Sequence, residues 1–181
     1  MTPAAHAGKA NCGSKTTTAA FTLWGDSAQY FLVSGGSFEP KDAAWTLKGG
    51  AKIVAGNEPW NLFGSGSSSL SPPGGATATS PEFCVSTGED IFRMLVNVPG
   101  VQGSLLRVDV TATNKASGVT NTGTLWFDGG VFHAWAATVP LPVPTAYDPN
   151  NHETVVIKIS SLGAPATFGI DDVAVDPYEN G

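Results

Sequence analysis

Two short stretches, Gly35-Gly36-Ser37-Phe38-Glu39 and Ile170-Asp171-Asp172-Val173, stand near opposite ends of this 181-residue chain and set carboxylates beside apolar residues. A carboxylate buried without a partner is costly. Oxygen ligands, without paired Cys or His, favour calcium over zinc or copper. We therefore expect Glu39, one of the pair Asp171 and Asp172, and nearby backbone carbonyls to hold a structural Ca²⁺ that ties the first strand to the last. Alternatively, Glu39 faces water and the two aspartates end a strand.

The same two stretches, with Trp45 soon after the first, resemble the β-jelly-roll carbohydrate-binding modules of the galactose-binding-like group. Those modules open with Gly-x-Phe-Glu followed by Gly-Trp or a similar pair and close on an Ile-Asp-Asp-Val strand, whereas Ala44 precedes Trp45 here. The string from Trp24 to Tyr178 also resembles a group of secreted actinobacterial proteins built on the same sandwich. The resemblance covers nearly the whole chain, and it implies a jelly roll that holds calcium and binds carbohydrate.

Length and charge limit the possible partners. A chain of 181 residues suits one domain and can bury a core without help from a metal or a disulfide. The formal charge is −6, and the nine Lys and Arg residues are scattered. Because no basic patch exists to neutralise phosphates, we expect no nucleic-acid partner. No run of about eighteen apolar residues is present, so we expect no membrane span.

The two cysteines and the N-terminus indicate export. Cys12 and Cys84 predict one disulfide in an oxidising compartment, and the alternative is two buried thiols in a cytosolic domain. The residues after Met1 look like a mature start from which an export signal was removed, so we expect a secreted protein. Residues 1–20 are small and polar and predict a flexible arm anchored at Cys12, followed by one sandwich domain over residues 21–181.

Short apolar runs bounded by Gly, Asp or Pro predict an all-β chain. Apolar and polar residues alternate strictly in 106–111 and again in 155–159, as in strands with one buried face. The last run changes parity at Asp171-Asp172, which predicts a bulge there. The rest of 55–82 is expected to be loop. We expect strands at 21–24, 30–33, 45–47, 52–54, 68–71, 91–98, 105–111, 124–127, 154–160 and 168–175. The predicted fold is a two-sheet antiparallel β-sandwich, a jelly roll.

The sequence shows no catalytic constellation. No Gly-x-Ser-x-Gly elbow is followed by a helix. The three histidines, His6, His133 and His152, lack the spacing of a zinc site. Carboxylates cannot be paired into a glycosidase site from sequence. We therefore name no catalytic residue and favour a non-catalytic carbohydrate-binding module. The alternatives are a polysaccharide-acting jelly-roll enzyme and an extracellular structural or adhesion domain.

One candidate sugar site is the loop that holds Asn57, Glu58 and Trp60. An amide and a carboxylate exchange hydrogen bonds with sugar hydroxyls, and an indole offers a stacking face for a pyranose ring. We predict that these three residues bind a polysaccharide or glycan. The alternative is that Asn57 and Glu58 cap a turn and Trp60 covers the core. Trp24 and Trp45 lie inside strand-like runs and are expected in the core.

A second candidate sugar site is an aromatic cluster on either side of Asp128-Gly129-Gly130. These residues predict a turn, and hence a hairpin that carries Trp126 and Trp135. Alternation places Trp126 and Phe127 on opposite faces of their strand. We predict that Trp126 and Trp135 contribute to glycan binding on the sheet.

Overall fold

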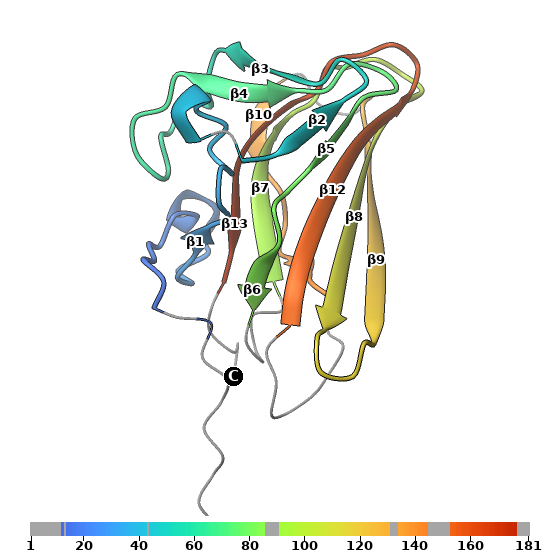
Figure 1. Cartoon of the computed structure of the whole chain (residues 1–181). Coiled ribbons are helices and arrows are strands. Elements are labelled where there is room, and N and C mark those ends of the chain that lie inside the picture. Colours follow the sequence, from blue (N-terminus) through green and yellow to red (C-terminus); the bar gives the residue numbers. More distant parts are fainter. Residues whose placement is uncertain are drawn as a thin grey trace, which may run out of the picture.

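The computed structural model describes residues 12, 14–42, 44–85, 91–130, 134–144 and 153–176. These residues form two antiparallel sheets that pack as two layers, which confirms the predicted β-sandwich (Figure 1). The regular elements among them are strands, apart from two 3-10 turns, η1 (Thr22–Trp24) and η2 (Pro40–Asp42). Within this part of the chain, no helix is long and apolar enough to cross a membrane.

The sheet that contains the last strand is called the β13 sheet. Its strand order is β10-β7-β13-β4-β3, with β1 paired to β13 and β11 paired to β7. Its strands are β1 (Phe31–Leu32), β3 (Lys52–Ala55), β4 (Ser68–Ser71), β7 (Ile91–Asn97), β10 (Trp135–Ala137), β11 (Leu141–Pro142) and β13 (Gly169–Val175).

The opposite layer is called the β12 sheet. Its strand order is β2-β5-β12-β8-β9, and β6 pairs with β12. Its strands are β2 (Thr46–Lys48), β5 (Thr77–Thr79), β6 (Phe83–Val85), β8 (Ser104–Asn114), β9 (Thr120–Asp128) and β12 (Glu153–Gly163). The two central strands, β8 and β12, are each eleven residues long and pair over their whole length.

The main core lies between the two sheets. Alternation along β8 sends Leu106, Val108 and Val110 inward, where all three are fully buried, while the residues between them are only partly buried. Phe92 and Met94 of β7 belong to the same buried cluster. Each such side chain contributes about 1.5–3 kcal/mol when it is fully removed from water. The alternation also leaves the outer face of the β12 sheet to polar side chains.

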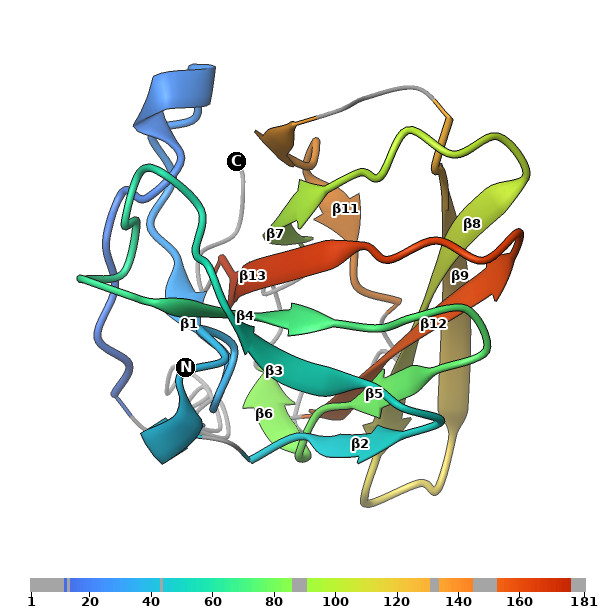
Figure 2. The ribbon, with the colours of Figure 1, turned by 90° about the horizontal axis from the view of Figure 1, so that it is seen from above.

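A second, smaller apolar cluster covers the outer face of the β13 sheet. Leu95 of β7 and Ala174 of β13 form this cluster with Ala20, Phe21 and Tyr30 of the N-terminal segment. This segment lies on the side of β13 away from β12 in both views (Figures 1 and 2). The partly buried side chains that pack against this cluster include three tryptophans, Trp24, Trp60 and Trp135. The β13 sheet is therefore packed on both faces.

A buried ion pair fastens the N-terminal segment to this sheet. The Arg93 side chain on β7 is 5% exposed, and its Nη1 donates to Asp26 Oδ2 at 2.6 Å. The Tyr30 hydroxyl donates to the same oxygen at 2.8 Å. Burial alone would raise the pKa of Asp26, but the hydrogen bonds from Tyr30 and Arg93 outweigh it and hold that pKa below its usual value. Asp26 is thus ionised in the native protein at neutral pH.

The predicted disulfide between Cys12 and Cys84 is present, with a Cα–Cα distance of 5.5 Å. Beside it, the Lys15 ammonium donates to the Cys84 carbonyl at 3.0 Å. The segment then makes an antiparallel bridge between Thr18 and Tyr30. These contacts tie the described part of the predicted arm to the sandwich, and residues 1–11 lie outside the described residues.

Three secondary-structure predictions are wrong. Residues 22–24 form a 3-10 turn and not a strand, because Gly25 takes a φ of +76° and its amide bonds back to Thr22. Trp24 is therefore partly exposed outside the main core, whereas Trp45 is buried as expected. The region 55–82 holds a second strand, β5, whose small residues give a weak sequence signal. Two more short strands, β6 and β11, were also not predicted.

The predicted hairpin around residues 128–130 does not form. Strand β9 ends at Asp128 and pairs with β8, whereas β10 pairs with β7 in the other sheet. The Gly129 amide bonds to the Ser104 carbonyl at 2.8 Å, which completes the pairing of β9 before the chain crosses between the layers. The predicted opposite orientation of Trp126 and Phe127 is confirmed, since Trp126 is exposed and Phe127 packs against the core.

Reducing the disulfide should destabilise the protein. Cys12 and Cys84 are 72 residues apart in sequence, and the loop-entropy account gives a stabilisation of roughly 4 kcal/mol for a loop of this size. Denaturant unfolding with and without a reducing agent measures the loss, and the double variant Cys12→Ser, Cys84→Ser serves as a control that should be indifferent to the reductant. Equal midpoints for reduced and oxidised wild-type protein would contradict the prediction.

Asp26→Asn should lower the free energy of unfolding by about 3 kcal/mol at pH 7, because it leaves the buried Arg93 charge without its partner. The pKa of Asp26 is lower in the folded protein than in the unfolded chain. Its contribution is therefore present above the unfolded pKa and is lost as the pH falls through the folded pKa. Unfolding measured from pH 7 to pH 2 should show the two proteins converging in acid. Asp128→Asn, at an exposed position, is the matched control; a constant gap at every pH would contradict the account.

Candidate functional site

A close approach of two backbone segments brings the stretch 35–39 next to the stretch 170–173. The Val33 amide donates to the Val173 carbonyl at 2.9 Å, and the Val173 amide donates to the Gly36 carbonyl at 3.1 Å. A Cβ on Gly36 would lie 2.7 Å from the Val173 carbonyl oxygen, so a side chain at position 36 would collide with the backbone of the last strand. Glycine at this position therefore sets the distance between the Glu39 stretch and the aspartate pair.

The aspartate pair lies in the predicted bulge of β13, which is confirmed. Pairing of β13 with β7 shifts register between Asp171 and Ala174. Asp172 takes a φ of +47°, a left-handed conformation that is uncommon for a residue with a side chain. Asp171 is 1% exposed and Asp172 is 5% exposed. The bulge thus presents two buried carboxylates in succession.

Glu39, Asp171 and Asp172 line one cavity of about 260 Å³ together with Lys41 and Asn57. Burial raises the pKa of Asp171 to about 8, and the Asp172 carboxylate adds to the rise. The pKa of Asp172 is raised to about 7, mainly by burial, and the negative charges of Glu58 and Glu39 add to the rise. Asp171 Oδ1 accepts the Asp172 amide at 2.9 Å, whereas the buried Oδ2 has no partner among the described residues. The cavity therefore gathers three carboxyl groups, and without a cation burial and mutual repulsion favour the protonated form of the two aspartates.

Glu39 is held by the loop before β4. Its Oε1 accepts the amides of Ser67 at 2.7 Å and Ser68 at 2.9 Å. The Ser67 amide lowers the pKa of Glu39, so this carboxylate stays ionised beside the aspartates. Glu39 does not simply face water. Glu39 is partly buried and directed at main-chain amides on the rim of the cavity.

The loop with Asn57, Glu58 and Trp60 is closed by its own hydrogen bonds. Glu58 is 2% exposed and accepts the amides of Trp60 and, at 3.2 Å, of Leu62. Trp60 packs edge-on against Trp24 with ring centroids 4.8 Å apart. Glu58 thus caps a turn, and Trp60 covers the outer face of the β13 sheet. Of the three, Asn57 reaches the cavity of the aspartates.

The residues predicted to bind metal are brought together, but their side chains alone do not make a metal cage. Within the described ranges, no three Asp, Glu, His or Cys side chains are grouped closely enough to hold a metal ion. Calcium accepts backbone carbonyls and water among its six to eight oxygen ligands, so carboxylates need not supply all of them. The three histidines, His6, His133 and His152, lie outside the described residues.

Trp126 lies on the opposite side of the sandwich, on the outer face of the β12 sheet. It is 53% exposed and is the one tryptophan of the described residues that is largely open to solvent. The Arg107 guanidinium lies 5.5 Å from its ring centre. Arg107 Nε donates to Asp109 at 2.9 Å, and the Thr124 hydroxyl donates to the same carboxylate oxygen at 2.7 Å. An exposed indole is therefore bordered by an ordered row of polar groups.

This row extends across the face. Pairing of β8 with its neighbours sets Asp109 between Thr124 of β9 and Lys158 of β12, and Lys158 pairs in turn with Thr79 of β5. Sequence reasoning did not assign Arg107, Thr124 or Lys158 to a site. The alternation of 106–111 was the signal that could have found Arg107 and Asp109, since it places them on the same outward face.

Trp135 does not join Trp126. It lines a shallow groove of about 250 Å³ on the outer face of the β13 sheet, with Asn57, Asn97 and two serines of β4. The predicted glycan-binding residues therefore divide into two groups. Asn57, Glu58, Trp60 and Trp135 belong to the β13 sheet side, and Trp126 stands on the β12 sheet.

Comparison with known proteins supports the fold. No protein-family model matches the chain, and no curated protein sequence does. A carbohydrate-binding module of family 28, specific for non-crystalline cellulose, has a TM-score of 0.51 at 14% identity, over 80% of this chain and 95% of that module. The chain has the β-sandwich fold of carbohydrate-binding modules. At this identity the likeness concerns the fold alone.

Two further solved structures are similar at lower scores. The C-terminal family 22 carbohydrate-binding module of Clostridium thermocellum Xyn10B has a TM-score of 0.42 at 14% identity, over 78% of this chain and 91% of that module. An arabinose-bound α-L-arabinofuranosidase has a TM-score of 0.48 at 18% identity, over 81% of this chain. The match spans 26% of that enzyme, about a quarter of its length.

Proposed function

We propose that this protein is a non-catalytic carbohydrate-binding module that binds a polysaccharide chain on the outer face of the β12 sheet. The observation that carries the proposal is Trp126, an indole 53% exposed on the edge strand β9 beside the polar outer face of the β12 sheet. An indole exposed at this level is costly to leave in water and suits the apolar face of a pyranose ring. The fold shared with a cellulose-specific module supports the same function.

The polar neighbours of Trp126 suit a neutral sugar chain. Arg107 offers donors, Asp109 offers acceptors, and the Thr124 hydroxyl, whose proton is donated to Asp109, can accept. Arg107 and Asp109 form an ion pair, so their charges cancel locally. Hydrogen bonds of this kind fix a sugar ring whose apolar face lies on the indole. The predicted sugar contacts of Asn57, Glu58, Trp60 and Trp135 stay predictions for the other side of the sandwich.

We also propose that the aspartate cavity holds a structural Ca²⁺, with Asp171, Asp172 and Glu39 among the ligands. The unpartnered buried oxygen of Asp171 and the mutual repulsion of the carboxylates suit a hard divalent cation. Lys41 lines the same cavity and supplies a single positive charge against them. A cation there would let both aspartates stay ionised at neutral pH and would stiffen the junction of the first and last strands.

Export of the protein is part of this proposal. A disulfide between Cys12 and Cys84 persists in oxidising compartments, outside the cytosol. A module that binds polysaccharide would also meet its ligand outside the cytosol. Both considerations favour a secreted protein.

Trp126→Ala should weaken binding to soluble polysaccharide by about 30-fold or more, as expected for a central aromatic contact. Affinity electrophoresis against xylan and soluble cellulose derivatives, with the fold checked by thermal melting, gives the measurement. Val119→Ala is the matched control, because Val119 is 50% exposed at the end of the same β8–β9 hairpin and should leave binding unchanged. Equal retardation of the Trp126→Ala and wild-type proteins would contradict this site.

Removal of calcium should lower the melting temperature, and added calcium should restore it. A ligand that binds only the native state contributes about 2.7 kcal/mol at a hundredfold excess over its dissociation constant. Asp171→Asn should remove the response to calcium, whereas Asp128→Asn, on the exposed end of β9, should retain it. A wild-type melting temperature that is the same in chelator and in calcium would contradict the calcium proposal without affecting the Trp126 site.

A further inference from the structure

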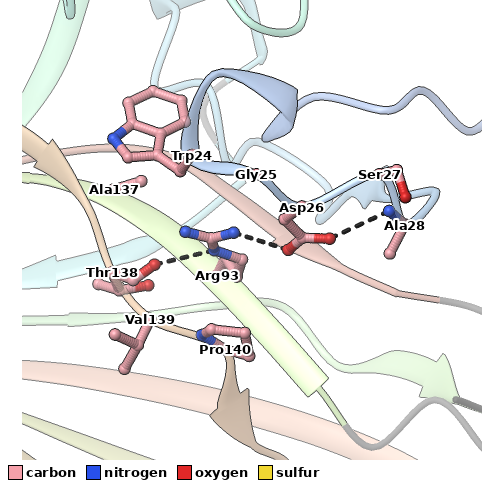
Figure 3. A pocket seen from close by; sticks show the side chains of 10 residues that line it. All are labelled: Trp24, Gly25, Asp26, Ser27, Ala28, Arg93, Ala137, Thr138, Val139 and Pro140. Atoms are coloured by element: carbon pink, nitrogen blue, oxygen red, sulfur yellow. Dashed lines mark hydrogen bonds and ion pairs between the residues drawn. The ribbon is translucent and has the colours of Figure 1, made fainter.

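One further pocket among the described residues belongs to neither proposed site. It measures about 720 Å³ and lies between the N-terminal segment and the chain that leaves β10 (Figure 3). Its volume falls within the usual range of about 300–1,000 Å³ for small-molecule sites. Ten residues line it: Trp24, Gly25, Asp26, Ser27, Ala28, Arg93, Ala137, Thr138, Val139 and Pro140.

Arg93 forms the floor of the pocket and keeps a donor group for a ligand. Its Nη1 is bound to Asp26 at 2.6 Å, its Nε donates to the Thr138 carbonyl at 2.8 Å, and its guanidinium lies 4.5 Å from the ring centre of Phe21. The remaining amino group, Nη2, makes no hydrogen bond to the described residues and points to the side of Trp24 and Ala137 in Figure 3. A side chain that is 5% exposed thus presents an unpartnered donor to the pocket.

The charge of the floor is balanced. Asp26 accepts from Tyr30, Arg93 and, at 3.0 Å, the Ala28 amide, and these contacts keep it ionised beside the guanidinium. An anionic ligand at Nη2 would be attracted by the positive charge of Arg93 and repelled by the negative charge of Asp26 a few ångströms away. Two carboxylate oxygens offer about four acceptor sites, and Asp26 uses three of them. The floor therefore offers a donor and an acceptor side by side to a neutral ligand.

The walls of the pocket add apolar surface and hydroxyl groups. The Trp24 indole stands at one side, with its orientation fixed by Trp60, and Val139 stands at the other, 68% exposed. The Thr138 hydroxyl accepts the Met94 amide at 3.2 Å, which leaves its own proton to donate. An aromatic wall over a floor of paired donor and acceptor suits a ring with one apolar face and neighbouring hydroxyls.

We propose that this pocket is a second carbohydrate site, which takes a single neutral pyranose unit such as the end of a glycan chain. Neighbouring hydroxyls of the sugar accept from Arg93 Nη2 and donate to Asp26, while the apolar face of the ring lies against Trp24. The pocket is on the β13 sheet side and Trp126 is on the β12 sheet, so the two sites can be tested separately. This inference stands on the geometry of the pocket and does not require binding at Trp126.

The test is titration of the 181-residue chain with methyl glycosides of glucose, xylose, galactose and mannose, followed by two-dimensional NMR of the Trp24 indole N–H and the Arg93 Nε–H. Glucuronate is the charged comparison. Single-ring ligands bind in the millimolar range, so titration runs to about 100 mM. We expect at least one neutral glycoside to shift both signals, with glucuronate binding no more tightly.

Three variants and one control locate the effect. Val139→Asp places a charge at the exposed rim without touching the Arg93–Asp26 pair, and it should weaken binding at least tenfold. Trp24→Ala should do the same if the protein folds. Trp126→Ala should leave this binding unchanged, and Val119→Asp is the control for an added surface charge. The proposal is overturned if no neutral glycoside shifts either signal, if glucuronate binds at least tenfold more tightly than every neutral glycoside, or if Val139→Asp binds like the wild type.

Discussion

The contact between Gly36 and the Val173 carbonyl is the constraint on which the rest of the structure depends. It joins the first strand to the last through two backbone hydrogen bonds and leaves no room for a side chain at position 36. In doing so it places Glu39 beside the bulge that carries Asp171 and Asp172. The junction that completes the sandwich is therefore also the place where the carboxyl groups of Glu39, Asp171 and Asp172 line one cavity. A cation at this point would offset the cost of burying these carboxylates and would link the first strand to the last.

The outer faces of the two sheets differ because the N-terminal segment packs on the β13 sheet. The N-terminal segment lies over the β13 sheet, where Phe21 and Tyr30 bury apolar residues and Asp26 neutralises Arg93. Nothing comparable among the described residues covers the β12 sheet, whose long strands keep a polar outer face with Trp126 exposed. The outer face of the β13 sheet is thus largely covered and hollowed by a pocket and a groove, and the β12 sheet offers an extended surface. An extended face suits a polymer, and a pocket suits a chain end.

Long alternating strands were predictable from sequence, and their partners were not. The patterns of 106–111 and 155–159 placed the central strands β8 and β12 correctly, because one face of each meets the core. The parity change at Asp171-Asp172 located the bulge. Strand β5 was missed because Thr77-Ala78-Thr79 is short and carries little apolar signal. Trp126 and Trp135 were assigned to one hairpin because local turn residues do not reveal a crossing between sheets.

The sequence likewise predicted some residues of the candidate sites and missed others. The sequence brought Glu39 and the aspartates into one hypothesis because carboxylates within apolar runs require compensation. It also pointed to Trp126, whose neighbours Arg107 and Asp109 follow once β8 is known to be a strand. The Arg93–Asp26 pair was beyond reach, since the two residues are 67 positions apart and neither stands in a recognisable pattern. Glu58 was predicted to bind sugar, yet its carboxylate oxygens accept hydrogen bonds from amides of its own turn.

The most direct test of the central claim is a crystal structure grown with calcium and measured for anomalous scattering. The account predicts one peak in the cavity between the first and last strands, with carboxylate oxygens of Asp171 and Asp172 about 2.3–2.6 Å from it. A cavity that holds no ion in the presence of calcium, with the Lys41 ammonium bound to the aspartates in its place, would contradict it.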